Sequence, residues 1–155
     1  MKKLVHNISV RVLEKDSTKI DNTKNGFNKV LPIDFEKENI NINHERAEGF
    51  NQKTIHILSM QTSKRRHNRL LLNTIFSKIS EKDKKRVNQE RETRVDTEGN
   101  FYLRLDKKSL LNKKYKITEG GDCFHLTVKL AAYPMNKGNI LQSLEQLLED
   151  MGIKK

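Results

Sequence analysis

The chain combines a length of 155 residues with a net charge of +11, from 31 Lys+Arg against 20 Asp+Glu. That length fits one domain over residues 1–155, and an apolar share of only 34% predicts a thin core between two layers. The only cysteine, Cys123, excludes an intramolecular disulfide and a cysteine metal cluster, and predicts a reducing, cytoplasmic setting. No apolar run of 7–15 residues follows the N-terminal lysines, and no stretch of about 20 apolar residues occurs, so we expect neither secretion nor a membrane span.

The N-terminal stretch predicts one strand followed by one helix. In residues 4–13 apolar side chains alternate with polar ones, which is the period of a half-buried strand. Residues 17–31 then place apolar side chains at helical spacing, and Pro32 marks the stop. Gly26 weakens the middle of this helix.

Two more strands and a long helix are expected next. Ile40 and Ile42 alternate with asparagines, and residues 54–60 form another short apolar stretch, so we predict a strand pair joined around Gly49. From Ser63 onward, apolar residues recur at intervals of three, four and seven, which predicts an amphipathic helix.

Residues 80–94 start with a capping pattern and contain almost no apolar residue, which predicts a solvated helix. Residues 100–106 and 124–130 alternate most clearly and are predicted strands. Between them, residues 115–118 followed by Gly120-Gly121 predict a hairpin.

The C-terminal residues 140–151 form an amphipathic helix that Gly152 ends. Together the elements predict an α+β fold, with a mainly antiparallel sheet and helices packed on one face. We find no repeat and no linker that would divide the chain.

The strongly basic balance is typical of proteins that bind polyanions, and RNA is the first candidate partner. An anionic membrane surface fits less well, because the apolar helices lack a basic opposite face. Between Lys64 and Arg94 eleven residues are basic and four are acidic, so this fifth of the chain carries seven of the eleven net charges.

Lys64, Arg65, Arg66 and Arg69 stand at a predicted helix start, where cations oppose the macrodipole by about 0.3–1 kcal/mol each. A phosphate grip explains why cations are kept at that cost. A solvated helical face is the alternative, and it is stronger for residues 82–86, where pairs such as Glu81 with Lys85 neutralise the charge.

The second candidate surface is the face of the sheet opposite the helices. Strand alternation places Arg11, Tyr102, Arg104, His125 and Lys129 on it. Such a set resembles a platform on which unpaired bases stack, and ordinary cross-strand polar pairing is the alternative. The residues assigned to RNA contact are Lys64, Arg65, Arg66, Arg69, Arg94, Tyr102, Arg104 and Lys129.

Nothing in the sequence predicts an enzyme, a cofactor or a metal. The five histidines, at positions 6, 44, 56, 67 and 125, lack metal-ligand spacing, and no glycine-rich phosphate loop, nucleophile elbow or paired-carboxylate motif occurs. A metal-free nuclease that uses histidine and lysine is the alternative left open. Cys123 at a strand start is expected to be structural.

Several segments in order resemble an archaeal family of predicted exosome-associated RNA-binding proteins. They are His6-Asn7-Ile8-Ser9-Val10-Arg11-Val12, Glu48-Gly49, Arg94-Val95-Asp96, Gly99-Asn100-Phe101-Tyr102-Leu103-Arg104-Leu105-Asp106-Lys107, Gly121-Asp122 and Val128-Lys129-Leu130-Ala131-Ala132-Tyr133-Pro134. The resemblance implies a fold like the large-subunit ribosomal protein that holds 5S RNA, archaeal origin, RNA binding and an association with the exosome.

Two hypotheses of function follow. The first is a non-catalytic RNA-binding protein, accessory to RNA processing or degradation, that grips phosphates with residues 64–69 and has Arg104 beside them. The second is a protein-interaction module that docks on an acidic partner, with the C-terminal helix sharing its apolar face across a homodimer.

Overall fold

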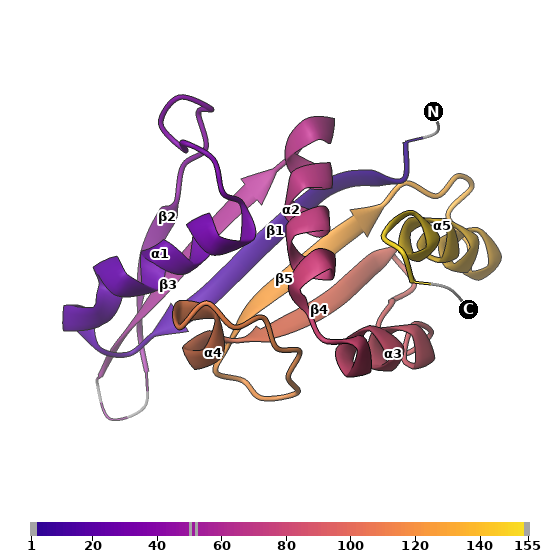
Figure 1. The fold of residues 1–155 in the computed structure, drawn as a ribbon. Coiled ribbons are helices and arrows are strands. Elements are labelled where there is room, and N and C mark those ends of the chain that lie inside the picture. The colour runs from indigo at the N-terminus through magenta and orange to yellow at the C-terminus, as the bar shows by residue number, and fades with distance from the viewer. Residues whose placement is uncertain (1–2, 50, 52, 154–155) are drawn as a thin grey trace.

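The computed structural model describes residues 3–49, 51 and 53–153, and it shows an α+β fold with one sheet and one layer of helices (Figure 1). The sheet has five strands in the order β2-β3-β1-β5-β4, and all neighbours are antiparallel. The strands are β1 (Val5–Glu14), β2 (Asn43–Glu48), β3 (Thr54–Thr62), β4 (Asn100–Asp106) and β5 (Cys123–Leu130). The helices are α1 (Ile20–Val30), α2 (Arg65–Lys78), α3 (Glu81–Gln89), α4 (Lys107–Leu111) and α5 (Lys137–Asp150), with a short 3-10 turn at Ser17–Lys19.

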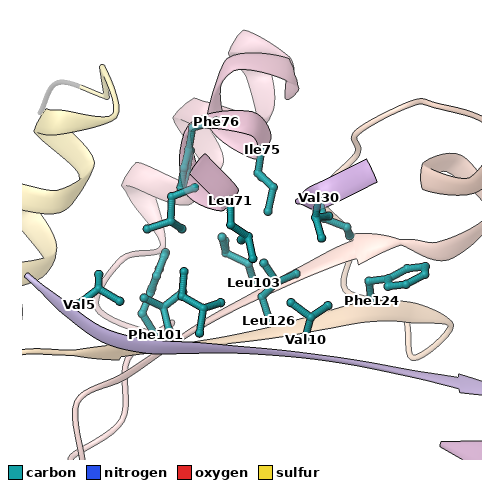
Figure 2. Close-up of a cluster of buried hydrophobic side chains, with 14 of the residues drawn as sticks. Val5, Val10, Val30, Leu71, Ile75, Phe76, Phe101, Leu103, Phe124 and Leu126 are labelled. Carbon is teal, nitrogen blue, oxygen red and sulfur yellow. The ribbon is translucent and has the colours of Figure 1, made fainter. Parts of the chain in front are cut away.

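The core lies between the sheet and the helices that cover one of its faces. In β1 the alternate residues Ile8, Val10 and Val12 are buried, as the period-two pattern predicts. Figure 2 shows Val10 and Leu103 of the sheet beneath Leu71 of α2. The opposite face of the sheet is left without helices, and the predicted two-layer α+β architecture is confirmed.

Gly26 is explained by the packing of α1 on β5. A Cβ atom at this position would stand 2.2 Å from the ring of Phe124, so only glycine lets the helix approach. The Phe124 ring meets Phe27 edge-on with centroids 5.5 Å apart. The residue that weakened the predicted helix is therefore what seats it on the sheet.

The predicted strand pair joined around Gly49 is confirmed, since β2 and β3 pair antiparallel on either side of it. The start of the first strand is wrong, because β2 begins only at Asn43 and leaves out Ile40 and Ile42. The two isoleucines are partly buried against the core instead. Every residue of β2 is exposed, and five of its six side chains are polar or charged, in the sequence Asn-His-Glu-Arg-Ala-Glu. A charged edge strand of this kind resists pairing with other chains, and it gives no apolar period to read.

The hairpin expected at residues 115–118 is also wrong. The connection from β4 to β5 contains α4, which begins where the Asp106 carboxylate accepts a hydrogen bond from the Ser109 amide. Residues 115–118 then form a single bridge, Leu105 with Ile117, on β4 and not on β5. Buried Leu110 and Ile117 hold this connection on the core, and such isolated apolar residues carry no period.

Two helices differ from the prediction in extent or partner. Helix α3 ends at Gln89 rather than near Arg94, and residues after it turn back toward β4. The apolar face of α5 packs on its own sheet, with Ile140, Leu144 and Leu148 at 2% exposure or less. The second hypothesis expected this face to be shared across a dimer, but the face is already buried against the sheet.

Candidate nucleic-acid interface

Three basic side chains lie directly opposite one another on the uncovered face of the sheet. Arg104 of β4 pairs in register with His125 of β5, and His125 pairs with Arg11 of β1. The guanidinium of Arg104 donates to the backbone oxygen of Glu119 at 3.2 Å, and the Arg11 side chain has no ion pair within the described residues. No carboxylate stands opposite Arg104, His125 or Arg11 in the strand register, so ordinary pairing of opposite charges does not explain this row.

We call Arg11, Tyr102, Arg104, His125 and Lys129 the sheet surface. Beside the basic row, small polar residues occupy the same face: Ser9 lies in register with Thr127, and Thr127 with Tyr102. Lys129 completes the surface, with its ammonium donating to the backbone oxygen of Glu98. The strand alternation predicted all five positions correctly.

His125 is held neutral by its surroundings. Burial lowers the pKa of this imidazole, and the nearby guanidinium groups of Arg104 and Arg11 lower it further. Its ring lies nearly parallel to that of Tyr102, at 9° with centroids 5.6 Å apart. A neutral imidazole beside two guanidinium groups becomes a third cation only when an anion arrives or the pH falls.

Tyr102 is oriented by a tight loop before β4. Its hydroxyl donates to Asp96 Oδ2 at 2.6 Å, and the same carboxylate accepts from the amide and side chain of Asn100. Burial opposes ionisation of Asp96, but these hydrogen bonds outweigh it and lower its pKa to about 2. The aromatic ring of the sheet surface is therefore fixed through its hydroxyl.

Arg94, which the sequence assigned to RNA contact, forms ion pairs within the protein. Its side chain is only 10% exposed and lies 2.7 Å from Glu90 and 3.4 Å from Glu119. It also donates to the backbone oxygen of Tyr102 at 3.4 Å. Two carboxylates neutralise this guanidinium, so the geometry gives it a structural role rather than a phosphate contact.

Lys64, Arg65, Arg66 and Arg69, which we call the helix surface, lie at the start of α2, and all four are exposed. Arg66 is paired with Glu38 at 2.6 Å. Lys64, Arg65 and Arg69 form no side-chain ion pair with any described residue, and the first turn contains no acidic residue. Three of these four cations therefore remain available to an anionic ligand.

The expectation that Arg104 lies beside the helix surface is wrong. Helix α2 packs on the covered face of the sheet, whereas Arg104 projects from the uncovered face between buried Leu103 and Leu105. The two basic surfaces belong to opposite layers of the fold. The sequence could not show this, because their relation depends on which face the helices cover.

One chain of polar groups has the outline of a catalytic relay. Ser17 Oγ lies 2.9 Å from His56 Nε2, and His56 Nδ1 lies 2.8 Å from His44 Nε2. A hydrolytic triad needs a carboxylate to stabilise the imidazolium, and here a second imidazole takes that place. Desolvation lowers the pKa of His44, and the nearness of His56 lowers it further. The chain therefore fits a structural hydrogen-bond ladder.

Residues 3–49, 51 and 53–153 contain no group of three or more His, Cys, Asp or Glu side chains placed to hold a metal ion. In the same residues no helix has the length and hydropathy of a membrane span. Cys123 is buried, and that burial raises the pKa of its thiol.

A family model described as RNA binding matches residues 7–130, a span that includes both basic surfaces. The chain belongs to this RNA-binding family. It is 24% identical over 144 residues to the RNA-binding protein PAB1135 of Pyrococcus abyssi, an alignment that covers 93% of this chain and 94% of that protein.

Solved structures of archaeal proteins share the fold of this family member. Mth689 of Methanothermobacter thermautotrophicus, described as a DUF54 protein, is 25% identical with a TM-score of 0.76, covering 94% of this chain and 99% of that one. AF2318 of Archaeoglobus fulgidus, of the same DUF54 family, is 15% identical with a TM-score of 0.80, covering 92% of this chain and 99% of that one. The relatives are archaeal, as the resemblance implied.

Two features of the surface were missed by the sequence reading. Tyr133, just after β5, is 96% exposed, which offers a second aromatic ring to solvent. A pocket also opens between α2, α5 and the start of β1. Tyr133 could have been found as an aromatic residue outside every periodic stretch. The pocket gives no local signal, because it joins three segments that are far apart in the sequence, residues 3–5, 65–73 and 147–151.

Proposed function

We propose that this member of the RNA-binding family binds single-stranded RNA on its sheet surface and has no catalytic centre of its own. The observation that carries the proposal is the unbroken row of Arg104, His125 and Arg11 across three neighbouring strands. Neither Arg104 nor Arg11 forms an ion pair among the described residues, since the nearby Glu119 pairs with Arg86 and Arg94. A phosphate backbone is a ligand that two such guanidinium groups can bind.

The remainder of the sheet surface suits unpaired RNA better than a duplex. Tyr102 offers one ring on which a base can stack, and small polar residues beside it leave the strand backbone accessible. An A-form duplex presents phosphates and hydroxyls but keeps its bases stacked inside, so it would leave the ring unused. We therefore expect single strands to bind more tightly than duplexes of equal length.

The test removes two charges from the row. Arg11→Gln with Arg104→Gln should make the log-log slope of RNA affinity against salt shallower by about 1.4, at about 0.7 per phosphate on a single strand. Fluorescence anisotropy with labelled 12-nucleotide oligo(U) and oligo(A), in salt from about 50 to 200 mM, measures that slope. A slope equal to that of the unaltered protein would reject the sheet surface as the binding site.

A matched control separates this site from general charge. Lys53→Gln with Lys137→Gln removes the same two charges from exposed positions in a loop and at the start of α5. Because neither residue belongs to the row, we expect the slope to change by much less than with the arginine pair. Equal changes from both variants would mean that RNA responds only to net charge.

We further propose that the protein is an accessory of RNA processing or degradation, with the exosome as a candidate partner. The support is the ordered resemblance to exosome-associated proteins together with the match to an RNA-binding family. Tagged protein can be recovered from an archaeal lysate with and without nuclease. Exosome subunits lost on nuclease treatment support an RNA bridge, whereas subunits that are retained support a protein interface and the second hypothesis.

A further inference from the structure

The pocket on the helical side has a composition that neither phosphate binding nor core packing alone explains. It has a volume of about 280 Å³ and lies between α2, the C-terminal end of α5 and the start of β1. Its walls include the apolar residues Val5, Leu72 and Leu147, and its rim includes Arg65 and Arg69 of the helix surface. We call this the α2–α5 pocket.

The apolar part of the pocket lining is formed by residues of the core. Leu72 is 1% exposed, Leu147 is 4% and Val5 is 8%, so they form a firm floor. A base that packs on this floor removes its own apolar surface from water, which is favourable at about 25 cal/mol per Å². A phosphate ion alone would gain no apolar contact from this floor, and removing it from water there would cost free energy.

The charged rim is not satisfied within the protein. Asp150 also lines the pocket, yet its carboxylate accepts from Gln146 at 3.0 Å and forms no ion pair with either arginine. Arg65 and Arg69 have no side-chain ion pair with any described residue. The pocket thus combines an apolar floor with two unpaired guanidinium groups, a combination that suits a ligand with both apolar and anionic parts.

The side-chain amide of Asn68, which also lines the pocket, has a buried donor without a hydrogen-bond partner among the described residues. The Asn68 side chain is 3% exposed, and its Oδ1 accepts from the Thr62 hydroxyl at 2.6 Å. Its Nδ2 has no hydrogen-bond partner among the described residues. An unmet buried donor costs about 1–3 kcal/mol, and this one belongs to a residue of the pocket lining.

We propose that the α2–α5 pocket receives one unpaired nucleotide of bound RNA, with its base against Leu72 and Leu147 and its flanking phosphates on Arg65 and Arg69. A nucleotide joins an apolar ring face, polar ring edges and anionic phosphates in one unit. A volume just below the usual range of about 300–1,000 Å³ for ligand pockets fits one ring system rather than a chain of them. The inference rests on the proposed function, because RNA is the ligand, but it concerns the layer opposite the sheet surface.

Methyl NMR tests the base directly. Titration with 12-nucleotide oligo(U) should move the methyl signals of Leu72 and Leu147, because an aromatic ring placed over them changes their local field. The same titration with an abasic oligomer of equal length should leave them in place, since it supplies phosphates without bases. Equal shifts with both oligomers, or none with either, would overturn the proposal.

A pocket-filling variant gives a second measurement. Leu4 lines the pocket at its half-buried mouth, and Leu4→Trp should fill the space and weaken oligo(U) binding severalfold while the fold is retained. If Leu4→Trp kept its oligo(U) affinity while Arg11→Gln with Arg104→Gln still weakened binding, the pocket proposal would be wrong and the sheet surface would remain the binding site. If the row variants also had no effect, the proposed function itself would fail. Shifts caused by an acidic peptide but not by RNA would overturn the nucleotide assignment.

Discussion

Two basic segments of similar composition have different fates in this fold. At the start of α2 the cations Lys64, Arg65 and Arg69 are exposed and unpaired among the described residues. In α3 and the segment that follows it, Arg86 and Arg94 share the carboxylates of Glu90 and Glu119. The charge of a segment therefore does not tell whether it faces a partner, because the decisive carboxylate can come from a distant loop.

The largest expected difference between the two segments is the loss of stability when Arg94 is replaced. We expect Arg94→Gln to lower the free energy of unfolding by about 1–3 kcal/mol, because Glu90 and Glu119 lose a partly buried partner. A chain of this size loses about 2–4 °C in melting temperature for each kcal/mol, so thermal unfolding measures the effect. The salt slope of RNA binding should not change.

Arg91→Gln is the matched control for that change. Arg91 lies three residues away and donates to the Asn88 side chain at 3.3 Å, with no ion pair among the described residues. Its replacement should change stability by no more than about 0.5 kcal/mol. If Arg94→Gln left stability intact and weakened RNA binding, the structural role of Arg94 would be wrong.

The opposite pattern is expected at the helix surface. Arg65→Gln with Arg69→Gln should make the salt slope of RNA affinity shallower by about 1.4. The same variant should keep or slightly raise stability, because each cation near the start of α2 opposes the helix dipole by about 0.3–1 kcal/mol. Loss of stability without a change in slope would contradict the assignment.

Arg66 provides the control within the same helical turn. Its guanidinium is already paired with Glu38 at 2.6 Å, so its charge is partly neutralised by the protein itself. We expect Arg66→Gln to change the RNA slope by less than the single variant Arg69→Gln. The two residues differ in pairing while sharing type, helix and exposure, which makes the comparison direct.

Strand alternation predicted the fold and the sheet surface because it records one-sided burial residue by residue. In β4 the buried residues Phe101, Leu103 and Leu105 left Tyr102 and Arg104 for solvent, and the structure confirms that division. The α+β class follows from such periods alone. The bounds of β2 and the existence of α4 could not be predicted in this way, because a charged edge strand and a five-residue helix have no apolar period.

The role of Arg94 could not be predicted for a different reason. Its spacing from Glu90 is visible in the sequence, but Glu119 lies 25 residues away and reaches it only through the folded connection before β5. The α2–α5 pocket has the same character, since it joins the start of β1 to α5. Local patterns predict which residues face water, and only the fold shows which of them meet.

A smaller effect is expected at the loop that holds Tyr102. Because hydrogen bonds keep the pKa of Asp96 at about 2, below its unfolded value, Asp96 stabilises the fold above about pH 5, and this is lost as the pH falls toward 2. With allowance for solvent screening, Asp96→Asn should cost about 1–2 kcal/mol near neutral pH. Urea unfolding at about pH 7 and pH 3 should show the gap between the two proteins closing in acid.

The smallest effect, and the most specific to the sheet surface, is the dependence of RNA binding on pH. Burial and the charges of Arg104 and Arg11 lower the pKa of free His125, while a phosphate beside it favours the charged imidazole and raises that pKa in the complex. Binding then takes up a proton, so RNA affinity should rise as the pH falls from about 8 to 5.5.

Other charged groups near His125 must be separated from this effect. Glu90, Arg94 and Glu119 line the same hollow, and only the imidazole has an ordinary pKa near 6.5, inside that pH interval. In His125→Gln the rise in affinity should therefore flatten, whereas Arg65→Gln with Arg69→Gln should weaken binding at every pH and keep the rise. An unchanged pH profile in His125→Gln would place the RNA away from the basic row, since a phosphate seated between Arg104 and Arg11 must contact the imidazole that lies between them.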